Sequence, residues 1–267
     1  MTGEIDEARA RISPIPAFDD NYIWLLRDPG RRLATLVDPG DADPVVAALA
    51  DEDLALAAIL ITHHHPDHTG GVLDLLAAFP DALVFGPQDR RIPGLNRPVS
   101  EGDEVRVPGH AEAFRVLEVP GHTATHIAFL GGRTLFCGDT LFAAGCGRVF
   151  DGTVEQLARS LARLAALPPD TLCYCAHEYT LANLGFAAWV EPNNAARQER
   201  QREVESQRAR HEPTVPSSLA LELATNPFLR TGEPVVVAAA ERFAGMRLQT
   251  QAEVFAALRR WKDTCYD

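Results

Sequence analysis

Short apolar runs alternate with amphipathic segments along the first two thirds of the chain. The apolar runs end at turn-forming residues and predict β-strands at Tyr22–Leu26, Leu33–Val37, Leu56–Ile61, Leu83–Phe85, Phe114–Val119, Ile127–Leu130, Thr134–Cys137 and Leu172–Cys175. Apolar residues at helical spacing predict helices at Asp43–Ala50, Val72–Phe79 and Val154–Ala166. Strands interspersed with helices are typical of an α/β fold, in which helix layers cover the faces of the sheets.

The character of the chain changes near Glu178. Ala195–Arg210 is a charged, glycine-free stretch of strong helix formers, and Ala252–Trp261 repeats that character. We therefore predict one large domain at residues 1–177 and a smaller, mostly helical C-terminal domain at residues 178–267. The charges from Arg197 to Arg210 carry both signs, which indicates a solvated helix face.

The composition is that of a chain that can bury a large core, since 46% of its 267 residues are hydrophobic. Lysine and arginine total 25 against 37 aspartate and glutamate residues, and this net charge of −12 argues against nucleic-acid binding. No apolar run reaches the length of a membrane span, and the acidic segment Met1–Arg11 is unlike a secretory signal or transit peptide. We expect a cytoplasmic monomer that binds no membrane, with Met1–Arg11 as a short solvated extension.

The cysteines indicate free thiols, because their number is odd and their spacings fit no disulfide framework: Cys137, Cys146, Cys173, Cys175 and Cys265. Cys173 and Cys175 could form a metal clip. However, the alternation in Leu172-Cys173-Tyr174-Cys175 suits strand residues that pack on opposite faces, and we favour that structural interpretation.

The most informative stretch is Thr62-His63-His64-His65-Pro66-Asp67-His68-Thr69-Gly70-Gly71. It places four potential metal ligands close together, namely His63, His65, Asp67 and His68. Imidazole and carboxylate groups together suit zinc, iron or manganese. The stretch follows a predicted strand and precedes a predicted helix, so we expect it on a strand-to-helix loop, where active-site residues are common. An exposed histidine-rich turn is the alternative, and residues elsewhere in the chain have to distinguish the two.

Three isolated residues, each after an apolar run, could complete the ligand set of a dinuclear site: His122 in Pro120-Gly121-His122, Asp139 in Cys137-Gly138-Asp139 and His177 in Cys175-Ala176-His177. Taken singly, such a histidine is more often a hydrogen-bonded core or surface residue, and an aspartate after glycine is more often a turn former. Together with the histidine-rich stretch, they indicate a metal hydrolase.

At these residues the chain resembles the metallo-β-lactamase superfamily, and within it the glyoxalase II (hydroxyacylglutathione hydrolase) family. The resemblance runs from Ile15-Pro16-Ala17-Phe18-Asp19-Asp20-Asn21-Tyr22-Ile23-Trp24 to Arg259-Arg260-Trp261-Lys262-Asp263. Superfamily motifs alone do not choose among lactamases, nucleases, lactonases and thioesterases. The more specific pieces are Gly145-Cys146-Gly147-Arg148, His177-Glu178-Tyr179-Thr180, Thr214-Val215-Pro216-Ser217-Ser218-Leu219, Asn226-Pro227-Phe228 and the pair Arg259 and Lys262.

The resemblance implies the superfamily's αββα sandwich and a thioester hydrolase with two divalent metal ions, zinc first, with iron or manganese as alternatives. It implies that the first ion is bound by His63, His65 and His122, the second by Asp67, His68 and His177, and that Asp139 bridges them. Asp67 and Asp139 are then catalytic residues as well as ligands. A hydroxide held by both metals would cleave S-D-lactoylglutathione to glutathione and D-lactate, the second step of methylglyoxal detoxification.

By the same resemblance, the glutathione moiety is held by Arg148, Tyr179, Arg259 and Lys262. Cationic side chains suit this ligand, because glutathione presents two carboxylates to them. Without the resemblance, Arg259 and Lys262 would be interpreted as a solvated basic patch.

Three further positions have an open role. Asp38 ends a strand and could orient a ligand histidine or simply form an Asp-Pro-Gly turn. Phe150 stands where some family members carry a tyrosine, so one hydroxyl contact to glutathione can be missing. Gly185 stands where a lysine is frequent in the family.

Two alternative functions remain open. One is a persulfide dioxygenase of the same superfamily, which uses one iron on two histidines and an aspartate. That enzyme usually lacks the helical C-terminal domain with its Arg259 and Lys262 pair. The other is a non-catalytic metal- or glutathione-binding module, for which we would expect at least one missing ligand, whereas all seven are present.

Overall fold

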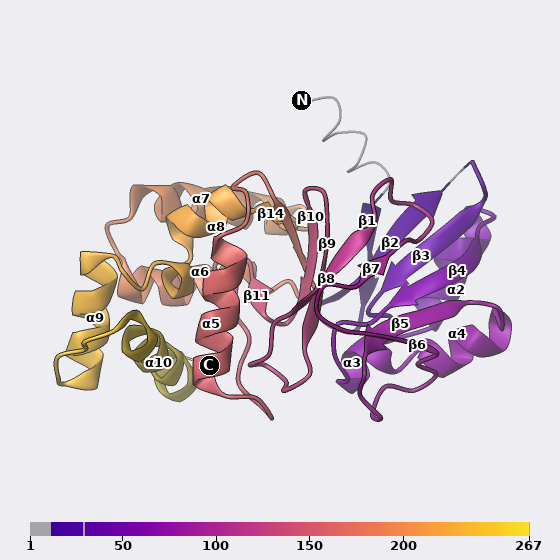
Figure 1. Ribbon diagram of the computed structural model, residues 1–267. Helices are drawn as coiled ribbons and strands as arrows, with labels where there is room; N and C mark the ends of the chain where they lie inside the picture. Colours follow the sequence, from indigo (N-terminus) through magenta and orange to yellow (C-terminus); the bar gives the residue numbers. More distant parts are fainter. Residues whose placement is uncertain (1–11, 29, 267) are drawn as a thin grey trace. The chain divides into compact units, whose positions relative to one another are not determined.

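The computed structural model describes residues 12–28 and 30–266 (Figure 1). The predicted extension Met1–Arg11 lies outside these described residues. The described chain divides into two compact units. Unit 1 comprises the residues up to Glu118 together with Thr125–Gly138, and unit 2 comprises Val119–Ala124 and the residues from Asp139 onwards. This division differs from the sequence domains 1–177 and 178–267, whose boundary stays a prediction.

The first sheet of unit 1 has its strands in sequence order: β1 (Ile12–Ala17), β2 (Asn21–Asp28), β3 (Leu33–Val37), β4 (Ala55–Leu60), β5 (Leu83–Pro87) and β6 (Arg97–Val99). Strands β1 to β3 are antiparallel, and β3 to β6 are parallel. The predicted strands in this region are confirmed. The sequence pattern missed β1, because it contains Pro14 and Pro16, and prolines within a strand are tolerated mainly at a sheet edge, where this strand lies.

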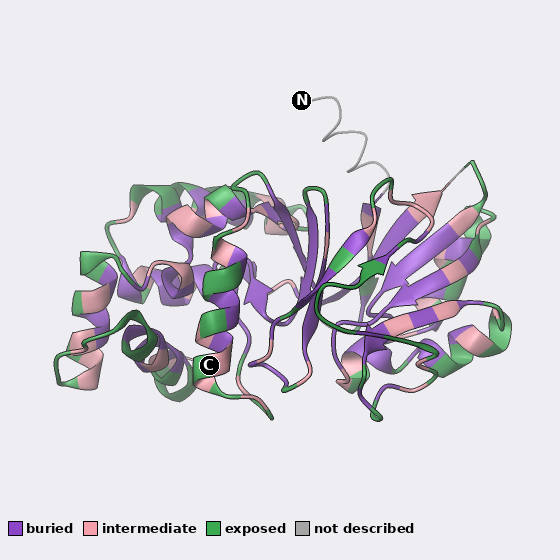
Figure 2. Ribbon diagram, viewed as in Figure 1, coloured by how far each residue is buried: buried purple, intermediate pink, exposed green. Residues whose placement is uncertain are grey.

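Helices α2 (Asp43–Asp51) and α4 (Val72–Ala78) cover one face of this sheet (Figure 1). Their buried side chains share a core with strand residues, including Val45, Leu75, Leu36 and Ile59. The opposite face is covered too, since Trp24 of β2 is only 2% exposed. Strands β2 to β4 are therefore almost wholly buried (Figure 2), and this rigid layer carries the loops at its carboxyl edge.

The second sheet of unit 1 is antiparallel and runs in the order β10 (Thr134–Gly138), β9 (Ile127–Gly131), β8 (Phe114–Glu118) and β7 (Glu104–Val105). Phe114 and Phe136 pack against each other with ring centroids 5.6 Å apart. Strands β8, β9 and β10 confirm the sequence prediction, whereas the two-residue strand β7 was too short to be predicted.

Unit 2 is mostly helical and contains two short strand pairs. The pairs are β11 (Leu141–Phe142) with β12 (Gly145–Cys146), and β13 (Leu172–Cys175) with β14 (Ser217–Ser218). The helices are α5 (Val154–Ala165), α6 (Thr180–Val190), α7 (Ala195–Ala209), α8 (Leu219–Thr225), α9 (Pro234–Ala244) and α10 (Gln251–Trp261), with single turns η1 (Pro227–Leu229) and η2 (Lys262–Tyr266).

Capping residues explain where two of these helices begin. Thr153 accepts a hydrogen bond from the backbone of Gln156, whose side chain bonds back to Thr153, and Thr250 and Glu253 do the same at α10. Helices α5, α7 and α10 confirm the sequence prediction. Helix α6 was missed because it is apolar almost all round, a pattern that marks a buried helix and shows no amphipathic period.

Helix α7 is more buried than the solvated helix that the sequence predicted. Arg197 and Arg200 are only 5% and 3% exposed, so the prediction of a solvated face was wrong for both. Arg200 donates to Glu222 of α8 at 2.6 Å and to Thr225 at 2.6 Å. Charge periodicity could not reveal this, because the partner carboxylate lies on another helix.

The cysteines are free, as predicted. Burial raises the pKa of Cys175 to about 12, so this thiol is protonated at neutral pH and behaves as a small buried apolar group. The structural interpretation of Cys173 and Cys175 is therefore supported. Among the described residues, no helix has both the length and the apolar composition that a bilayer crossing requires.

Candidate metal and substrate site

The histidine-rich stretch follows β4 in unit 1. His63 and His65 lie on the connection after the strand, whereas Asp67 and His68 lie in a single helical turn, α3 (Pro66–Thr69). This differs from the expected open loop. Pro66 occupies the first helical position, and the Thr69 hydroxyl donates to the His65 carbonyl at 3.1 Å, so the sequence itself favours the turn.

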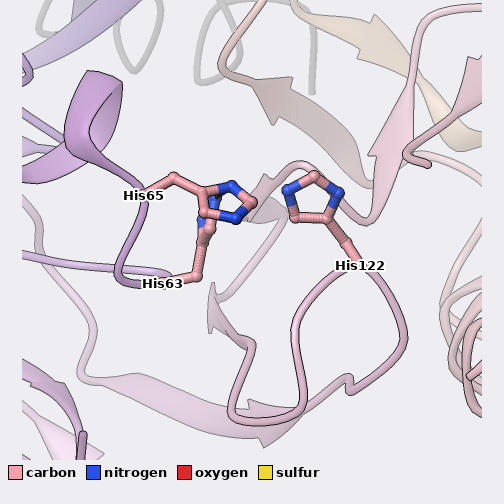
Figure 3. Close-up of side chains that lie close together, drawn as sticks. All are labelled: His63, His65 and His122. Carbon is pink, nitrogen blue, oxygen red and sulfur yellow. Dashed lines mark hydrogen bonds between the residues drawn. The ribbon is translucent and has the colours of Figure 1, made fainter. Parts of the chain in front are cut away.

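Two pairs of ligand atoms face each other within this stretch. Nε2 of His63 lies 3.0 Å from Nδ1 of His65 (Figure 3), and Nε2 of His68 lies 3.4 Å from Oδ2 of Asp67. Two ring nitrogens facing each other at such a distance require a proton or a cation between them, because their lone pairs repel. The arrangement has the donor chemistry of a site for a borderline divalent metal.

Asp38 orients His68. The buried Asp38 carboxylate accepts from the Thr62 backbone at 2.8 Å, from the Thr62 hydroxyl at 2.7 Å and from His68 Nδ1 at 3.1 Å. A carboxylate only accepts, so the His68 proton is on Nδ1 and Nε2 is left as the ligand atom facing Asp67. Of the two roles that the sequence left open for Asp38, the orienting role is the one that the structure favours.

Asp38→Asn is expected to lower metal affinity by about 10- to 100-fold. Asparagine tolerates the positive φ of 52° at this position, so the backbone is preserved. Its oxygen should keep the Thr62 backbone bond, which turns the amide NH₂ toward His68 Nδ1 and moves the imidazole proton to the ligand atom. Metal affinity should be measured by competition with a chelator, with the exposed Asp81→Asn as control; equal affinities would contradict the orienting role.

Two contacts of the histidine-rich stretch had no clear signal in the sequence. The Asn21 amide donates to Asp67 Oδ2 at 3.2 Å and so fixes that carboxylate. Asp89, in the connection after β5, lies 3.6 Å from His64 Nδ1 and accepts from Thr125 at 2.7 Å. Hydrogen bonds from Arg91 hold the pKa of Asp89 well below its usual range, so it is ionised at neutral pH.

In unit 2, three predicted ligands come together around one carboxylate oxygen. Asp139 Oδ2 lies 3.5 Å from His122 Nε2 and 3.4 Å from His177 Nε2. All three side chains are buried. The ring of His122, labelled in Figure 3, is oriented by a backbone contact, because its Nδ1 lies 2.8 Å from the Arg148 carbonyl oxygen. A carboxylate between two imidazole Nε2 atoms suits a residue that is shared by two metal ions.

The sequence motif after His177 anchors that ligand. Glu178 accepts from the Thr214 backbone at 2.8 Å and from the Thr214 hydroxyl at 2.5 Å. The same hydroxyl contacts Thr180 Oγ1 at 2.6 Å. Hydrogen bonds therefore join the Thr214 motif to the His177-Glu178 motif, although the two are far apart in the sequence. These bonds fix the backbone next to His177.

The predicted substrate-binding residues are also in unit 2. Tyr179 stacks on His177 with ring centroids 4.7 Å apart, and the Arg148 side chain is 52% exposed. Arg259 and Lys262 are only 2% and 7% exposed, so the alternative of a solvated basic patch is wrong for both. The role of these four side chains in glutathione binding stays a prediction.

Phe150 and Gly185, the two departures from the family pattern, lie in different surroundings. Phe150 is 64% exposed, and its ring centroid lies 5.1 Å from that of His122. Gly185 lies in α6 beside Tyr266, whose hydroxyl oxygen occupies the space where a Cβ at position 185 would stand. A side chain at position 185 therefore cannot be accommodated while Tyr266 keeps its place.

Comparison with known proteins extends these observations. The family model described as Metallo-beta-lactamase superfamily matches residues 17–177, and the model described as Hydroxyacylglutathione hydrolase C-terminus matches residues 178–265. A curated Hydroxyacylglutathione hydrolase of Alkalilimnicola ehrlichii is 60% identical over 252 residues, which is 94% of this chain and 98% of the relative.

Solved structures agree on the fold. The crystal structure of ETHE1 from Myxococcus xanthus matches with a TM-score of 0.63 and 27% identity, covering 96% of this chain and 99% of that one. TTHA1623, solved in a di-iron-bound form, matches with a TM-score of 0.58 and 28% identity, covering 81% of this chain and 100% of that one. The predicted metallo-β-lactamase fold with a helical C-terminal part is thus confirmed.

The C-terminal match counts against the persulfide dioxygenase alternative, for which no such domain is expected. The near-complete coverage of a relative at 60% identity is much more specific than the superfamily fold. The chain therefore belongs to the hydroxyacylglutathione hydrolase family of the metallo-β-lactamase superfamily.

Proposed function

We propose that this chain is a glyoxalase II thioester hydrolase that converts S-D-lactoylglutathione to glutathione and D-lactate. The observation that carries the proposal is the buried Asp139 carboxylate, whose Oδ2 lies within 3.5 Å of both His122 Nε2 and His177 Nε2. Family membership supports the substrate, because the relative that matches over nearly its whole length is named hydroxyacylglutathione hydrolase.

The seven predicted ligands are proposed to hold two divalent ions. His63, His65 and His122 would bind one ion, Asp67, His68 and His177 the other, and Asp139 both. The support is chemical: His68 and His122 each turn Nδ1 toward an oxygen of the chain, which leaves Nε2 for a metal. Zinc suits this donor set, and manganese accepts the same donors. Iron is a further alternative, because the related TTHA1623 was solved in a di-iron-bound form.

When bound, two such cations would lower the pKa of water toward neutrality and polarise the thioester carbonyl. The chain itself supplies the positioning. Tyr179, stacked on His177, and Arg148, Arg259 and Lys262 would bind the glutathione moiety, whose carboxylates pair with cations. The departing thiolate has a parent pKa of roughly 8.5 and so needs no strong general acid.

The proposal includes a cytoplasmic monomer with no nucleic-acid or membrane partner. The net charge of −12 supports the absence of a nucleic-acid partner, because phosphate binding requires excess positive charge. The proposed domains, residues 1–177 and 178–267, are supported by the two family models, which match residues 17–177 and 178–265.

Hydrolysis of S-D-lactoylglutathione by the purified, metal-loaded protein tests this function. The matched control is the D-lactoyl thioester of a thiol without the glutathione carboxylates. We expect fast turnover of the glutathione thioester and slow turnover of the control, with metal analysis of the same sample identifying the ions. No turnover of either ester by a protein with full metal content would refute the proposed activity.

A further inference from the structure

The Arg259 guanidinium, near the end of α10, is buried and bonded to its own chain. Nη1 donates to the Cys146 carbonyl at 3.1 Å, while Nε and Nη2 both donate to Asp263 Oδ1, at 3.1 and 2.8 Å. The guanidinium also lies 5.3 Å above the Phe228 ring. Three separate segments of unit 2 therefore fix the position of this cation.

Asp263 connects Arg259 to a second arginine. Its Oδ1 lies 3.7 Å from Nε of Arg148, and the two side chains are 36% and 52% exposed. Two guanidinium groups brought near one site repel each other unless an anion lies between them. The Asp263 carboxylate is that anion, and it leaves the outer side of Arg148 accessible.

We propose that Asp263 is a positioning residue for substrate binding, which holds Arg148 and Arg259 together so that they can receive a carboxylate of the substrate. This inference rests on the proposed function, because it takes glutathione as the ligand of the two arginines. Asp263 should act on binding rather than on the chemical step. Among the described residues, Asp263 accepts hydrogen bonds from Arg259 and forms an ion pair with Arg148, and it has no such contact with His122, Asp139 or His177.

Asp263 is a better residue to test than Arg259. Replacing Arg259 removes a buried side chain and its bond to the Cys146 carbonyl, so the loss of binding and the loss of fold would be hard to separate. Asp263→Asn keeps the size of a partly exposed side chain and removes only its charge. The exposed Glu212→Gln is the matched control, since Glu212 also pairs with an arginine, Arg210, and the change in net charge is the same.

The experiment measures binding of S-methylglutathione, a thioether that cannot be hydrolysed, to the metal-loaded protein by calorimetry. We expect Asp263→Asn to raise the Kd, and the KM for S-D-lactoylglutathione, about tenfold, with kcat within about twofold of the unchanged chain. Glu212→Gln should match the unchanged chain. The diethyl ester of the same ligand, which lacks the carboxylates, should bind equally weakly to all three proteins.

Several outcomes would overturn the proposal. An unchanged Kd would show that Asp263 does not position the arginines, and a lower Kd would show that it competes with the substrate instead. Asp263→Glu, which keeps the charge, should bind within about threefold of the unchanged chain, so weak binding by this variant in its folded form would also count against the proposal. Thermal melts verify folding. If the unchanged chain binds S-methylglutathione but hydrolyses no thioester, the proposed function fails while the role of Asp263 is still decided.

Discussion

His177→Ala is expected to lower kcat for S-D-lactoylglutathione by roughly 10³-fold or more, because it removes one proposed ligand of a metal that supplies several kcal/mol of catalysis. His177 Nε2 lies 3.4 Å from Asp139 Oδ2, so the change also removes a neighbour of the shared carboxylate. Bound metal should fall from about two ions per chain to about one. Elemental analysis and steady-state kinetics on the same sample provide the measurement.

A control separates this effect from a general loss of structure. The ring of His177 packs against the rings of Tyr179 and Phe142, so alanine also opens a space in unit 2. His211→Asn, at an exposed residue with a positive φ of 59° that asparagine tolerates, should leave both metal content and turnover unchanged. Full activity in a folded His177→Ala protein would refute the dinuclear assignment.

Glu222→Ala is expected to lower the free energy of unfolding by about 3–5 kcal/mol, because it leaves a buried guanidinium without its counter-ion. The Arg200 and Glu222 side chains are 2% and 1% exposed, and Arg200 Nη2 lies 2.6 Å from Glu222 Oε1. Glu222 also accepts from Ser217, from Asn226 at 3.1 Å and from the Ala144 backbone at 2.8 Å. Ala144 lies between β11 and β12 and has a positive φ of 56°, which is unusual for a residue other than glycine. The hydrogen bond from its N–H to Glu222 stabilises this conformation.

Urea denaturation of the metal-loaded protein measures the change in unfolding free energy. Glu222→Gln should be less harmful than Glu222→Ala, since the amide can still accept from Arg200 and keeps the shape of the side chain. Glu212→Ala removes an exposed partner of Arg210 and should leave the denaturation midpoint nearly unchanged. A Glu222→Ala midpoint equal to that of Glu212→Ala would show that the buried cluster is not a determinant of stability.

The sequence pattern predicted elements that bury one face or form a continuous apolar run. Strands β4 and β10 and helices α5 and α10 belong to these classes and were confirmed. Strand β1 was missed because prolines interrupt its pattern, and α9 because its alanine- and valine-rich segment has a weak period. In each case, tertiary packing rather than local sequence decides the structure.

The candidate site was predictable where a ligand follows a strand. His63, Asp139 and His177 all follow strand ends, and their residue types and positions made them candidates once they were taken together with the histidine-rich stretch. The contacts that support the site and the helices around it were harder to predict from the sequence. The contact of Arg148 with Asp263 and the burial of Arg200 depend on residues distant in the sequence, and no local pattern encodes such pairs.

The close approach of Tyr266 to Gly185 limits what position 185 can hold. Tyr266 also packs against Phe186 and Trp189, with ring centroids 5.6 and 4.9 Å away, so its place is fixed by several partners. A side chain added at position 185 therefore requires the Tyr266 ring to move away from these partners. The aromatic C-terminal turn thus sets a steric limit on this position of α6.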